Sequence, residues 1–274
     1  MKFHKYHGAG NDFIILNNMD LSINEADYPR LAAVLCRRHM SVGADGLMAV
    51  EPSGIADYRM RFYNSDGSAG EMCGNGARCI CRYGYEMGLA GETQRVETAS
   101  GIVVGQRLEK RIYRVQLTDP TLIELHRTVT VNGTDYDCAY IELGNPGLPH
   151  AVIRVPGLAD MPLDDIRGLG CALRHYAEFP KGANANLYDL EGADRAVLRT
   201  FERGVEDFTF ACGTGSAATA LTIADGDSAD RSVSLRQMGG TVTVDIHHTA
   251  GGIELYLAGP TSIIAEGEIL DEDL

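Results

Sequence analysis

Two cysteines stand in sequence contexts that could support acid–base chemistry. Cys73 lies in the stretch 64–79, NSDGSAGEMCGNGARC, directly before Gly-Asn-Gly and a run with helical spacing. Cys212 lies in the stretch 210–218, FACGTGSAA, which repeats the same design. A cysteine at the start of a helix meets unpaired backbone N–H groups and the positive end of the helix dipole. Both effects favour the thiolate over the thiol, so each cysteine is a candidate base.

Two such groups on opposite faces of one carbon could invert a centre that bears hydrogen. A thiolate would remove the proton from one face, and the opposite thiol would return a proton to the other. The two thiols would titrate as a pair, so thiol and thiolate describe the pair rather than fixed residues. The N–H groups of two helix N-termini suit the carbanion charge that spreads onto a substrate carboxylate. This chemistry requires no cofactor and no metal, and we expect none.

An internal repeat connects the two cysteines, which are 139 positions apart. The same shift aligns four further pairs: Gly8 with Gly147, Ile14 with Ile153, Gly101 with Gly240, and Val103 with Val242. One shift that fits several separate places indicates a duplicated unit. The sequence therefore predicts two similar domains, residues 1–119 with Cys73 and residues 120–261 with Cys212. Residues 262–274 are a possible final strand that returns to the first domain.

The periodicity of apolar residues predicts an α+β fold, with a mixed or antiparallel sheet around a central helix in each domain. Helices are expected at 29–39, with Asp27 as a possible cap, and at 74–87, 163–173 and 216–224. Strands are expected between them, and Asn132-Gly133 indicates a hairpin between 128–131 and 136–143. The glycines after Cys212 also fit a dinucleotide fingerprint, but no clear parallel βαβ unit is predicted around them.

Composition excludes several classes of protein. The 274 residues carry a formal net charge of −14 and no basic run, which argues against a nucleic-acid partner. No apolar run approaches the roughly 20 residues that span a bilayer, and the first residues lack a signal pattern, so no membrane is expected. An odd number of cysteines, seven, in a chain of this size favours reduced thiols in the cytoplasm.

The other five cysteines lack a comparable context. They are Cys36, Cys79, Cys81, Cys138 and Cys171. The spacing Cys-x5-Cys-x-Cys at 73–81 does not match a zinc site. A thiol redox or binding protein that uses Cys73 and Cys212 as a switch is an alternative. The Gly-x-Gly after each cysteine would then have no purpose, and no Cys-x-x-Cys occurs.

At these residues the sequence resembles the diaminopimelate epimerase family over nearly the whole chain. The matching segments are HGAGNDF (7–13), GADGLM (43–48), NSDGS (64–68), CGNGARC (73–79), GLPH (147–150), GANAN (182–186), FERG (201–204) and ACGTGSA (211–217). The resemblance implies a pseudo-symmetric two-domain fold with its active site in the cleft. It also implies a cytoplasmic, cofactor-independent homodimer that interconverts L,L- and meso-diaminopimelate in lysine and peptidoglycan synthesis.

The resemblance also assigns roles to individual residues. It makes Cys73 and Cys212 the acid–base pair. The positions that match substrate-binding residues are Asn11, Asn64, Gly74, Asn75, His150, Asn184, Glu202, Arg203, Gly213 and Thr214. These types suit a small amino-acid substrate with a second amino-acid head. An arginine can clamp the distal carboxylate through two hydrogen bonds, and a glutamate can take the ammonium group.

Three departures from the family pattern concern the substrate. Leu148 stands where many members have an asparagine, and Gly46 stands where some have glutamine. Glu202 and Cys212 are ten positions apart, one more than the commonest spacing. A racemase of another amino acid on the same fold, for example histidine, is therefore the alternative enzyme. More distant relatives isomerise carbon–carbon double bonds, but they typically lack the paired cysteines.

Overall fold

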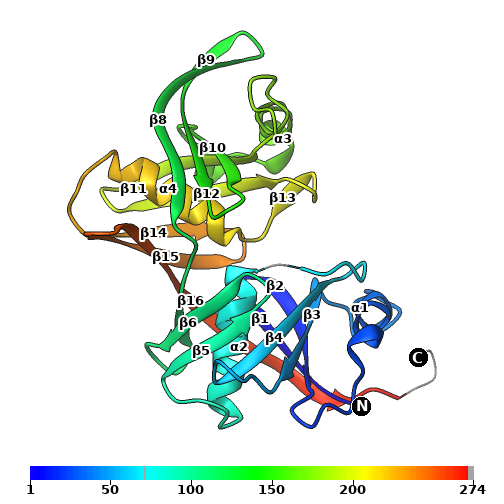
Figure 1. Ribbon diagram of the computed structural model, residues 1–274. Helices are drawn as coiled ribbons and strands as arrows, with labels where there is room; N and C mark the ends of the chain where they lie inside the picture. The colour runs from blue at the N-terminus through cyan, green and yellow to red at the C-terminus, as the bar shows by residue number, and fades with distance from the viewer. Residues whose placement is uncertain (71, 271–274) are drawn as a thin grey trace. The chain divides into compact units, whose positions relative to one another are not determined.

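A computed structural model describes residues 1–70 and 72–270 and divides the chain into two compact units (Figure 1). Unit 1 consists of Met1–Val115 and the chain from Gly259 onward, and unit 2 is Gln116–Ala258. The sequence placed these boundaries at 119/120 and 261/262. The second observed boundary falls inside one long strand, β16 (Gly252–Glu268), which begins in unit 2 and ends in unit 1. A boundary within continuous β-structure leaves no linker signal in the sequence.

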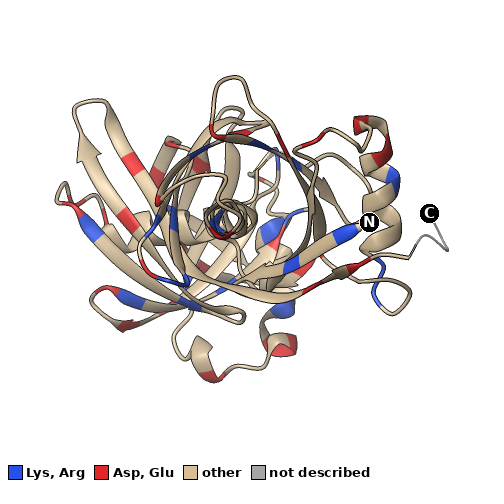
Figure 2. Ribbon diagram, turned by 90° about the horizontal axis from the view of Figure 1, so that it is seen from below, with Lys and Arg blue, Asp and Glu red and all other residues tan. Residues whose placement is uncertain are grey.

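Unit 1 is a ring of strands around a helix. Its elements are β1 (Lys2–Gly8), β2 (Asn11–Asn17), the 3-10 turn η1 (Glu25–Asp27), α1 (Tyr28–Leu35), β3 (Gly46–Glu51), β4 (Tyr58–Asn64), α2 (Gly74–Glu86), β5 (Thr93–Thr98), β6 (Gly101–Arg107) and β7 (Ile112–Gln116). The strands pair in sequence order from β1 to β7, and β16 pairs with both β7 and β1. In Figure 2 a helix is seen end-on inside such a ring of strands.

The central helix α2 is buried on all sides, from Asn75 to Gly84 without interruption. Small side chains let the surrounding strands approach it. A methyl group on Gly84 would meet the Tyr58 hydroxyl at 2.5 Å and its ring at 2.7 Å. A helix that is enclosed in this way is fixed in position, and so is its N-terminus, where Cys73 stands.

Unit 2 also arranges its strands around one central helix. Its elements are β8 (Pro120–Val131), β9 (Thr134–Leu143), β10 (Leu148–Arg154), the 3-10 turn η2 (Leu158–Asp160), α3 (Leu163–Arg174), β11 (Asn184–Gly192), β12 (Arg195–Glu202), β13 (Asp207–Thr209), α4 (Gly213–Ala224), β14 (Arg231–Gln237) and β15 (Gly240–Thr249). The central helix, α4, contacts β9, β10, β11, β12, β14 and β15. The predicted hairpin at Asn132-Gly133 is confirmed, with φ of 51° and 78° at the two turn residues. The apolar core lies between α3 and the sheet and includes Ile153, Leu173 and Phe201.

Element by element, the two units follow the same order. In unit 1, α1 connects the parallel strands β2 and β3, and α2 connects the parallel strands β4 and β5. In unit 2, α3 connects the parallel strands β10 and β11, and α4 lies between the parallel strands β12 and β14. The intervening pairs are antiparallel. This confirms the duplicated α+β fold. It also corrects one expectation, because a parallel strand–helix–strand unit does surround the Gly-rich segment after Cys212.

Two helix ends differ from the prediction. Helix α1 ends at Leu35 rather than at 39, and His39 has a left-handed φ of 71° that no helix continues through. Asp27 is the N-cap residue of α1, but its side chain makes no cap hydrogen bond with the described helix. Helix α4 begins at Gly213, directly after Cys212.

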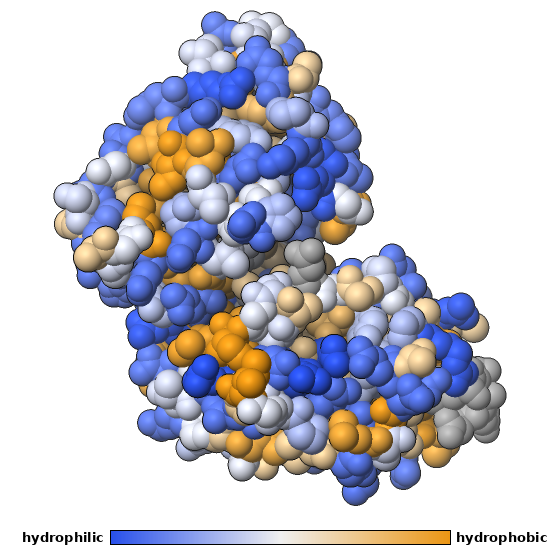
Figure 3. Space-filling view, in the orientation of Figure 1, coloured by the Kyte–Doolittle hydropathy of each residue, from blue (hydrophilic) through white to orange (hydrophobic). Residues whose placement is uncertain are grey.

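The surface of each unit carries both hydrophobic and hydrophilic residues. On the face in Figure 3, hydrophobic groups are interspersed with hydrophilic ones. In unit 1 the exposed apolar side chains include Ile263 and Ile264, which are 44% and 50% exposed on β16. Within residues 1–70 and 72–270, no helix is both long enough and apolar enough to cross a bilayer.

Candidate active site

In unit 1, candidate site residues surround the N-terminus of α2. Cys73 is the N-cap residue, with extended φ and ψ of −121° and 117°, and its carbonyl accepts the first helical hydrogen bond from Ala77 at 2.7 Å. Its side chain is half-buried. Gly74 and Asn75 form the first turn, so their N–H groups lie at the positive end of the helix.

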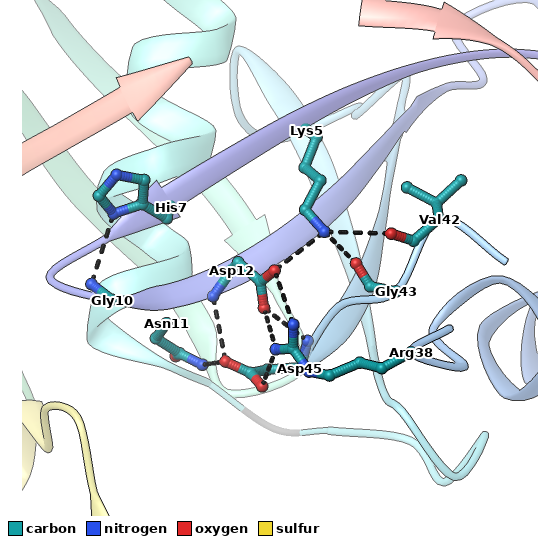
Figure 4. Close-up of polar contacts among 9 residues, drawn as sticks. All are labelled: Lys5, His7, Gly10, Asn11, Asp12, Arg38, Val42, Gly43 and Asp45. Carbon is teal, nitrogen blue, oxygen red and sulfur yellow. Dashed lines mark hydrogen bonds and ion pairs between the residues drawn. The ribbon is translucent and has the colours of Figure 1, made fainter. Parts of the chain in front are cut away.

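The Cys73 thiol contacts the side chain of Asn11, at the start of β2. The sulfur donates to the Asn11 Oδ1 over 3.4 Å. The other end of that amide, Nδ2, donates to the Asp45 carboxylate at 2.7 Å (Figure 4). The structure therefore brings a predicted substrate-binding residue and a predicted acid–base residue together.

Asn64 and Asn75 flank the same helix terminus. Asn64 ends β4, is exposed, and donates through Nδ2 to the Ser68 hydroxyl at 3.0 Å. Asn75 is buried, and its Oδ1 accepts from the Arg78 guanidinium at 2.8 Å. Arg78 is fully buried, and its guanidinium also approaches the Gly74 carbonyl at 3.4 Å. The Asn75 amide is therefore held from within the helix, whereas Asn64 faces solvent.

In unit 2, a second set of candidate residues surrounds the N-terminus of α4. Cys212 is the N-cap residue, with φ and ψ of −117° and 117°, nearly the same as Cys73. Its sulfur accepts from the Gly215 N–H at 3.3 Å and lies 3.5 Å from the Thr214 hydroxyl. A hydrogen bond donated to sulfur favours the thiolate. Cys73 makes no such bond to the described N–H groups of its own helix.

The Cys212 backbone is held by two residues that the sequence did not indicate. Its N–H donates to the Gln237 Oε1 at 2.9 Å, and its carbonyl accepts from the Ser216 hydroxyl at 2.7 Å. The Gln237 Nε2 donates to the same hydroxyl at 2.9 Å. Gln237 ends β14, 25 positions from the cysteine, so no local pattern could have pointed to it.

Asn184, Glu202 and Arg203 meet where β11 and β12 pair. The Asn184 Oδ1 accepts from the Arg203 N–H at 2.7 Å, which fixes the arginine backbone. The Arg203 guanidinium donates to the Lys181 carbonyl at 3.2 Å. Burial raises the pKa of the Glu202 carboxyl, although a hydrogen bond from the Thr209 hydroxyl at 2.8 Å opposes this. A half-buried carboxylate and an arginine therefore stand side by side in the chain.

Thr209 belongs to the segment that contains the extra residue between Glu202 and Cys212. That segment forms a short third strand, β13, whose residues 207–209 pair with 200–202 of β12. The segment thus forms a hairpin that gives the Glu202 carboxylate a hydroxyl partner, Thr209. Leu148, the other departure, is half-buried and begins β10 two positions before His150.

His150 is fully buried rather than placed on an open surface. Burial, together with the positive charge of Arg203, lowers its pKa to about 3, so the ring is neutral at any working pH. The Asn186 amide faces its Nδ1 at 3.3 Å, and its Nε2 has no hydrogen-bond partner among the described residues. Asn186 also accepts from the Thr200 hydroxyl at 2.9 Å. This polar cluster lies beneath Gly215 and the start of α4.

The fold is similar to those of solved PhzF-family and proline racemase structures. A PhzF-family phenazine biosynthesis protein from Bacillus anthracis matches 98% of this chain and 99% of its own, with a TM-score of 0.77 and 17% identity. A probable proline racemase from Agrobacterium radiobacter K84 covers 98% of this chain and 92% of its own, with a TM-score of 0.68 and 15% identity. These likenesses concern the fold alone.

Sequence similarity then identifies the family. The family model for diaminopimelate epimerase matches residues 3–123 and 143–264. The diaminopimelate epimerase of Aquifex aeolicus is 36% identical over 100% of this chain and 99% of its own length. That of Methanothrix thermoacetophila is 34% identical over 100% and 98%. The chain belongs to the diaminopimelate epimerase family. It is an isomerase with diaminopimelate epimerase function, in lysine biosynthesis.

Proposed function

We propose that this isomerase inverts the α-carbon of diaminopimelate with a thiolate–thiol pair, Cys73 and Cys212, without a cofactor. The single observation that carries the proposal is the equivalence of the two cysteines. Each is the N-cap residue of the central helix of its unit, with the same backbone conformation and the same Gly-x-Gly after it. One residue from each repeated unit supplies the base on one face of the carbon and the acid on the other.

The contacts of the two sulfurs suggest how the pair rests before substrate binds. Cys212 accepts a helix N–H, which favours its thiolate, whereas Cys73 donates to a carbonyl oxygen, which requires its thiol. In one direction of the reaction the Cys212 thiolate takes the substrate proton and Cys73 supplies another. In the reverse direction the roles exchange. The N–H groups at Gly74, Asn75, Gly213 and Thr214 stabilise the carbanion charge on the substrate carboxylate.

Isotope exchange tests this proposal directly. We expect the purified protein to exchange the α-hydrogen of diaminopimelate with heavy water, without added pyridoxal phosphate or metal ion and in the presence of a chelator. Deuterium should enter the epimerised product from the acid thiol, because the proton removed by the base differs from the proton delivered. Epimerisation that depends on added pyridoxal phosphate would contradict the cofactor-independent scheme.

The distal amino-acid head of the substrate is assigned to Glu202 and Arg203. Arg203 binds the distal carboxylate and Glu202 binds the distal ammonium group, with Asn184 fixing the Arg203 backbone. Asn11, Asn64 and His150 complete the polar set around the reacting head. The neutral state of His150 supports a role as a hydrogen-bond donor through Nε2 rather than as a titrating base.

Glu202→Gln is expected to raise KM for diaminopimelate by about tenfold, because a charge-assisted hydrogen bond to the ammonium is lost. It should also stabilise the fold at neutral pH. Burial raises the folded-state pKa of Glu202, so ionisation costs stability as pH rises through that pKa. Urea unfolding should therefore show a variant more stable than the parent at pH 8, with the difference vanishing towards pH 4. A variant less stable than the parent at pH 8 would contradict this assignment of the carboxyl.

We further propose that the enzyme is a cytoplasmic homodimer acting on a small amino acid alone. An odd number of cysteines, seven, in a chain of this size supports a reducing compartment. Exposed isoleucines on β16, Ile263 and Ile264, supply apolar surface that a second copy could cover. Sedimentation of the purified protein measures the oligomeric state.

A further inference from the structure

The Asn11 amide lies between two groups that constrain it from opposite ends. Its Nδ2 donates to the Asp45 Oδ2 at 2.7 Å, and its Oδ1 accepts from the Cys73 sulfur at 3.4 Å. The same Asp45 oxygen accepts from the Asp12 N–H at 3.1 Å. Asp45 comes from the loop before β3 and Asn11 from the start of β2, so the contact joins two separate segments of unit 1 (Figure 4).

Asp45 is itself held by a charged network. Its Oδ1 accepts from the Arg38 guanidinium at 2.9 Å, and the same guanidinium nitrogen binds Asp12 at 2.7 Å. Lys5 binds Asp12 at 2.9 Å, and the Asp45 N–H donates to Asp12 at 3.0 Å. Burial opposes ionisation of Asp12, but hydrogen bonds from Lys5 and Arg38 outweigh it and lower the pKa of this carboxyl. The Asp45 carboxylate thus accepts hydrogen bonds at both oxygens, Oδ2 from the Asp12 N–H and Oδ1 from Arg38, and is held in a fixed position.

This network determines which way the amide faces. An ionised carboxylate can only accept hydrogen bonds, so the end of Asn11 that faces Asp45 must be the NH₂ group. The carbonyl oxygen must then face Cys73. Because that oxygen also only accepts, the sulfur must be the donor and therefore a protonated thiol. A hydrogen bond to the neutral form of an acid disfavours its ionisation.

We propose that Asp45 is a positioning residue for the epimerase reaction, which fixes the Asn11 amide so that its carbonyl oxygen holds Cys73 as the thiol. The proposal rests on the acid–base role proposed above for Cys73. Asp45 lies in the GADGLM segment, but the sequence alone indicates no role for it, because Asp45 contacts Asn11 only in the folded chain. Without Asp45 the amide can turn over and present its NH₂ group to the sulfur, which favours the thiolate instead.

The test measures alkylation of Cys73 by iodoacetamide as a function of pH, followed on the Cys73 peptide by mass spectrometry. In Asp45→Ala the apparent pKa of Cys73 alkylation is expected to fall, with a several-fold larger thiolate fraction at pH 7. The peptide that carries Cys171, an exposed cysteine on α3, is the internal control, and its alkylation should not change. We expect kcat/KM for diaminopimelate to fall about tenfold, since the acid group is no longer oriented.

A double-mutant cycle separates orientation of Asn11 from a simple loss of charge. In an Asn11→Ala background, Asp45→Ala should cause no further shift of the Cys73 profile, because the amide through which Asp45 acts is gone. Asp45→Asn, whose amide oxygen can still accept from Asn11, should restore part of the parent profile and covers the case in which Asp45→Ala does not fold. Asp20→Ala, which removes an exposed carboxylate that accepts from the Ser22 N–H, is the matched control and should leave both profiles unchanged.

Two results would overturn the proposal. One is an unchanged Cys73 profile in both folded Asp45 variants. The other is an equal shift of the Cys73 alkylation pKa in the presence and absence of the Asn11 side chain. Asp45 would then act on Cys73 through its charge alone. A failure of the proposed acid–base role can be told apart from a failure of this proposal. If Cys73 is not an acid–base group, Cys73→Ala will keep full turnover. The alkylation profile of Cys73 in the Asp45 variants will still show whether Asp45 orients the Asn11 amide.

Discussion

Replacement of Cys73 or of Cys212 by alanine is expected to lower epimerase turnover by about a thousandfold or more in each case. The reaction needs a base on one face of the α-carbon and an acid on the other, so loss of either thiol leaves a path with no proton donor or no acceptor. The loss should appear in kcat rather than in KM, because neither sulfur is assigned to ground-state binding of the substrate.

The fold should survive both substitutions. Each removes one sulfur at a helix N-cap, but the cysteine carbonyls still accept the first backbone hydrogen bonds of α2 and α4. Cys212→Ala also loses the hydrogen bond from the Gly215 N–H to the sulfur, which costs about 1 kcal/mol. Circular dichroism and urea unfolding should therefore show transitions close to those of the parent. Loss of activity with loss of cooperative unfolding would not support an acid–base role.

Two other cysteines provide matched controls. Cys171 is exposed on α3, and Cys138 is buried in β9 with a pKa that burial raises to about 12. Alanine at either position should leave turnover within a few-fold of the parent. Alanine at Cys138 should cost stability through the small cavity that it creates. Near-parental turnover in Cys73→Ala or in Cys212→Ala would refute the two-thiol scheme.

Much of the fold could be predicted because its signals are local. The hairpin at Asn132-Gly133 depends on two residues that accept positive φ, and helix α2 begins at a Gly-rich turn followed by apolar residues at helical spacing. The duplication was visible because equivalent turns keep their glycines at a constant shift. The two cysteines were found in the same way, since a helix start leaves a pattern within a few residues.

The contacts that hold these groups depend on distant pairing, and no short pattern records them. Gln237 reaches Cys212 across 25 positions, and Asp45 reaches Asn11 across 34. The parallel pairing of β12 with β14 also joins strands separated by a hairpin and a helix, so it was not expected. Exposure was equally hard to judge: His150 and Asn75 are polar residues that the fold buries.

Two equivalent glycines should respond very differently to a methyl group. Gly76 and Gly215 occupy the third position of α2 and α4. A Cβ on Gly215 would overlap the Asn186 Oδ1 and come within 3.0 Å of the Thr200 hydroxyl. Those two groups are hydrogen-bonded to each other at 2.9 Å, and the Asn186 amide also faces the Ala151 carbonyl at 3.3 Å, so the cluster cannot move aside.

A Cβ on Gly76 meets a softer neighbour. Its nearest atom would be the Met48 terminal methyl at 2.6 Å, the far end of a flexible side chain, and the next would be Phe13 at 3.5 Å. Methionine adjusts to such changes at low cost. Alanine also favours a helix over glycine by about 1 kcal/mol, which offsets the repacking.

We therefore expect Gly215→Ala to lose about 2–3 kcal/mol of unfolding free energy, as overpacking of a rigid site does. Its turnover should fall about a hundredfold, because the Gly215 N–H that binds the Cys212 sulfur is displaced with the start of α4. Gly76→Ala should stay within about 1 kcal/mol of the parent and keep most of its turnover. Urea unfolding and steady-state epimerisation measure both. Equal losses of stability and turnover in the two variants would contradict this prediction. They would mean that both glycines serve close approach of the backbone to the substrate, and that the buried cluster under Gly215 does not distinguish the two positions.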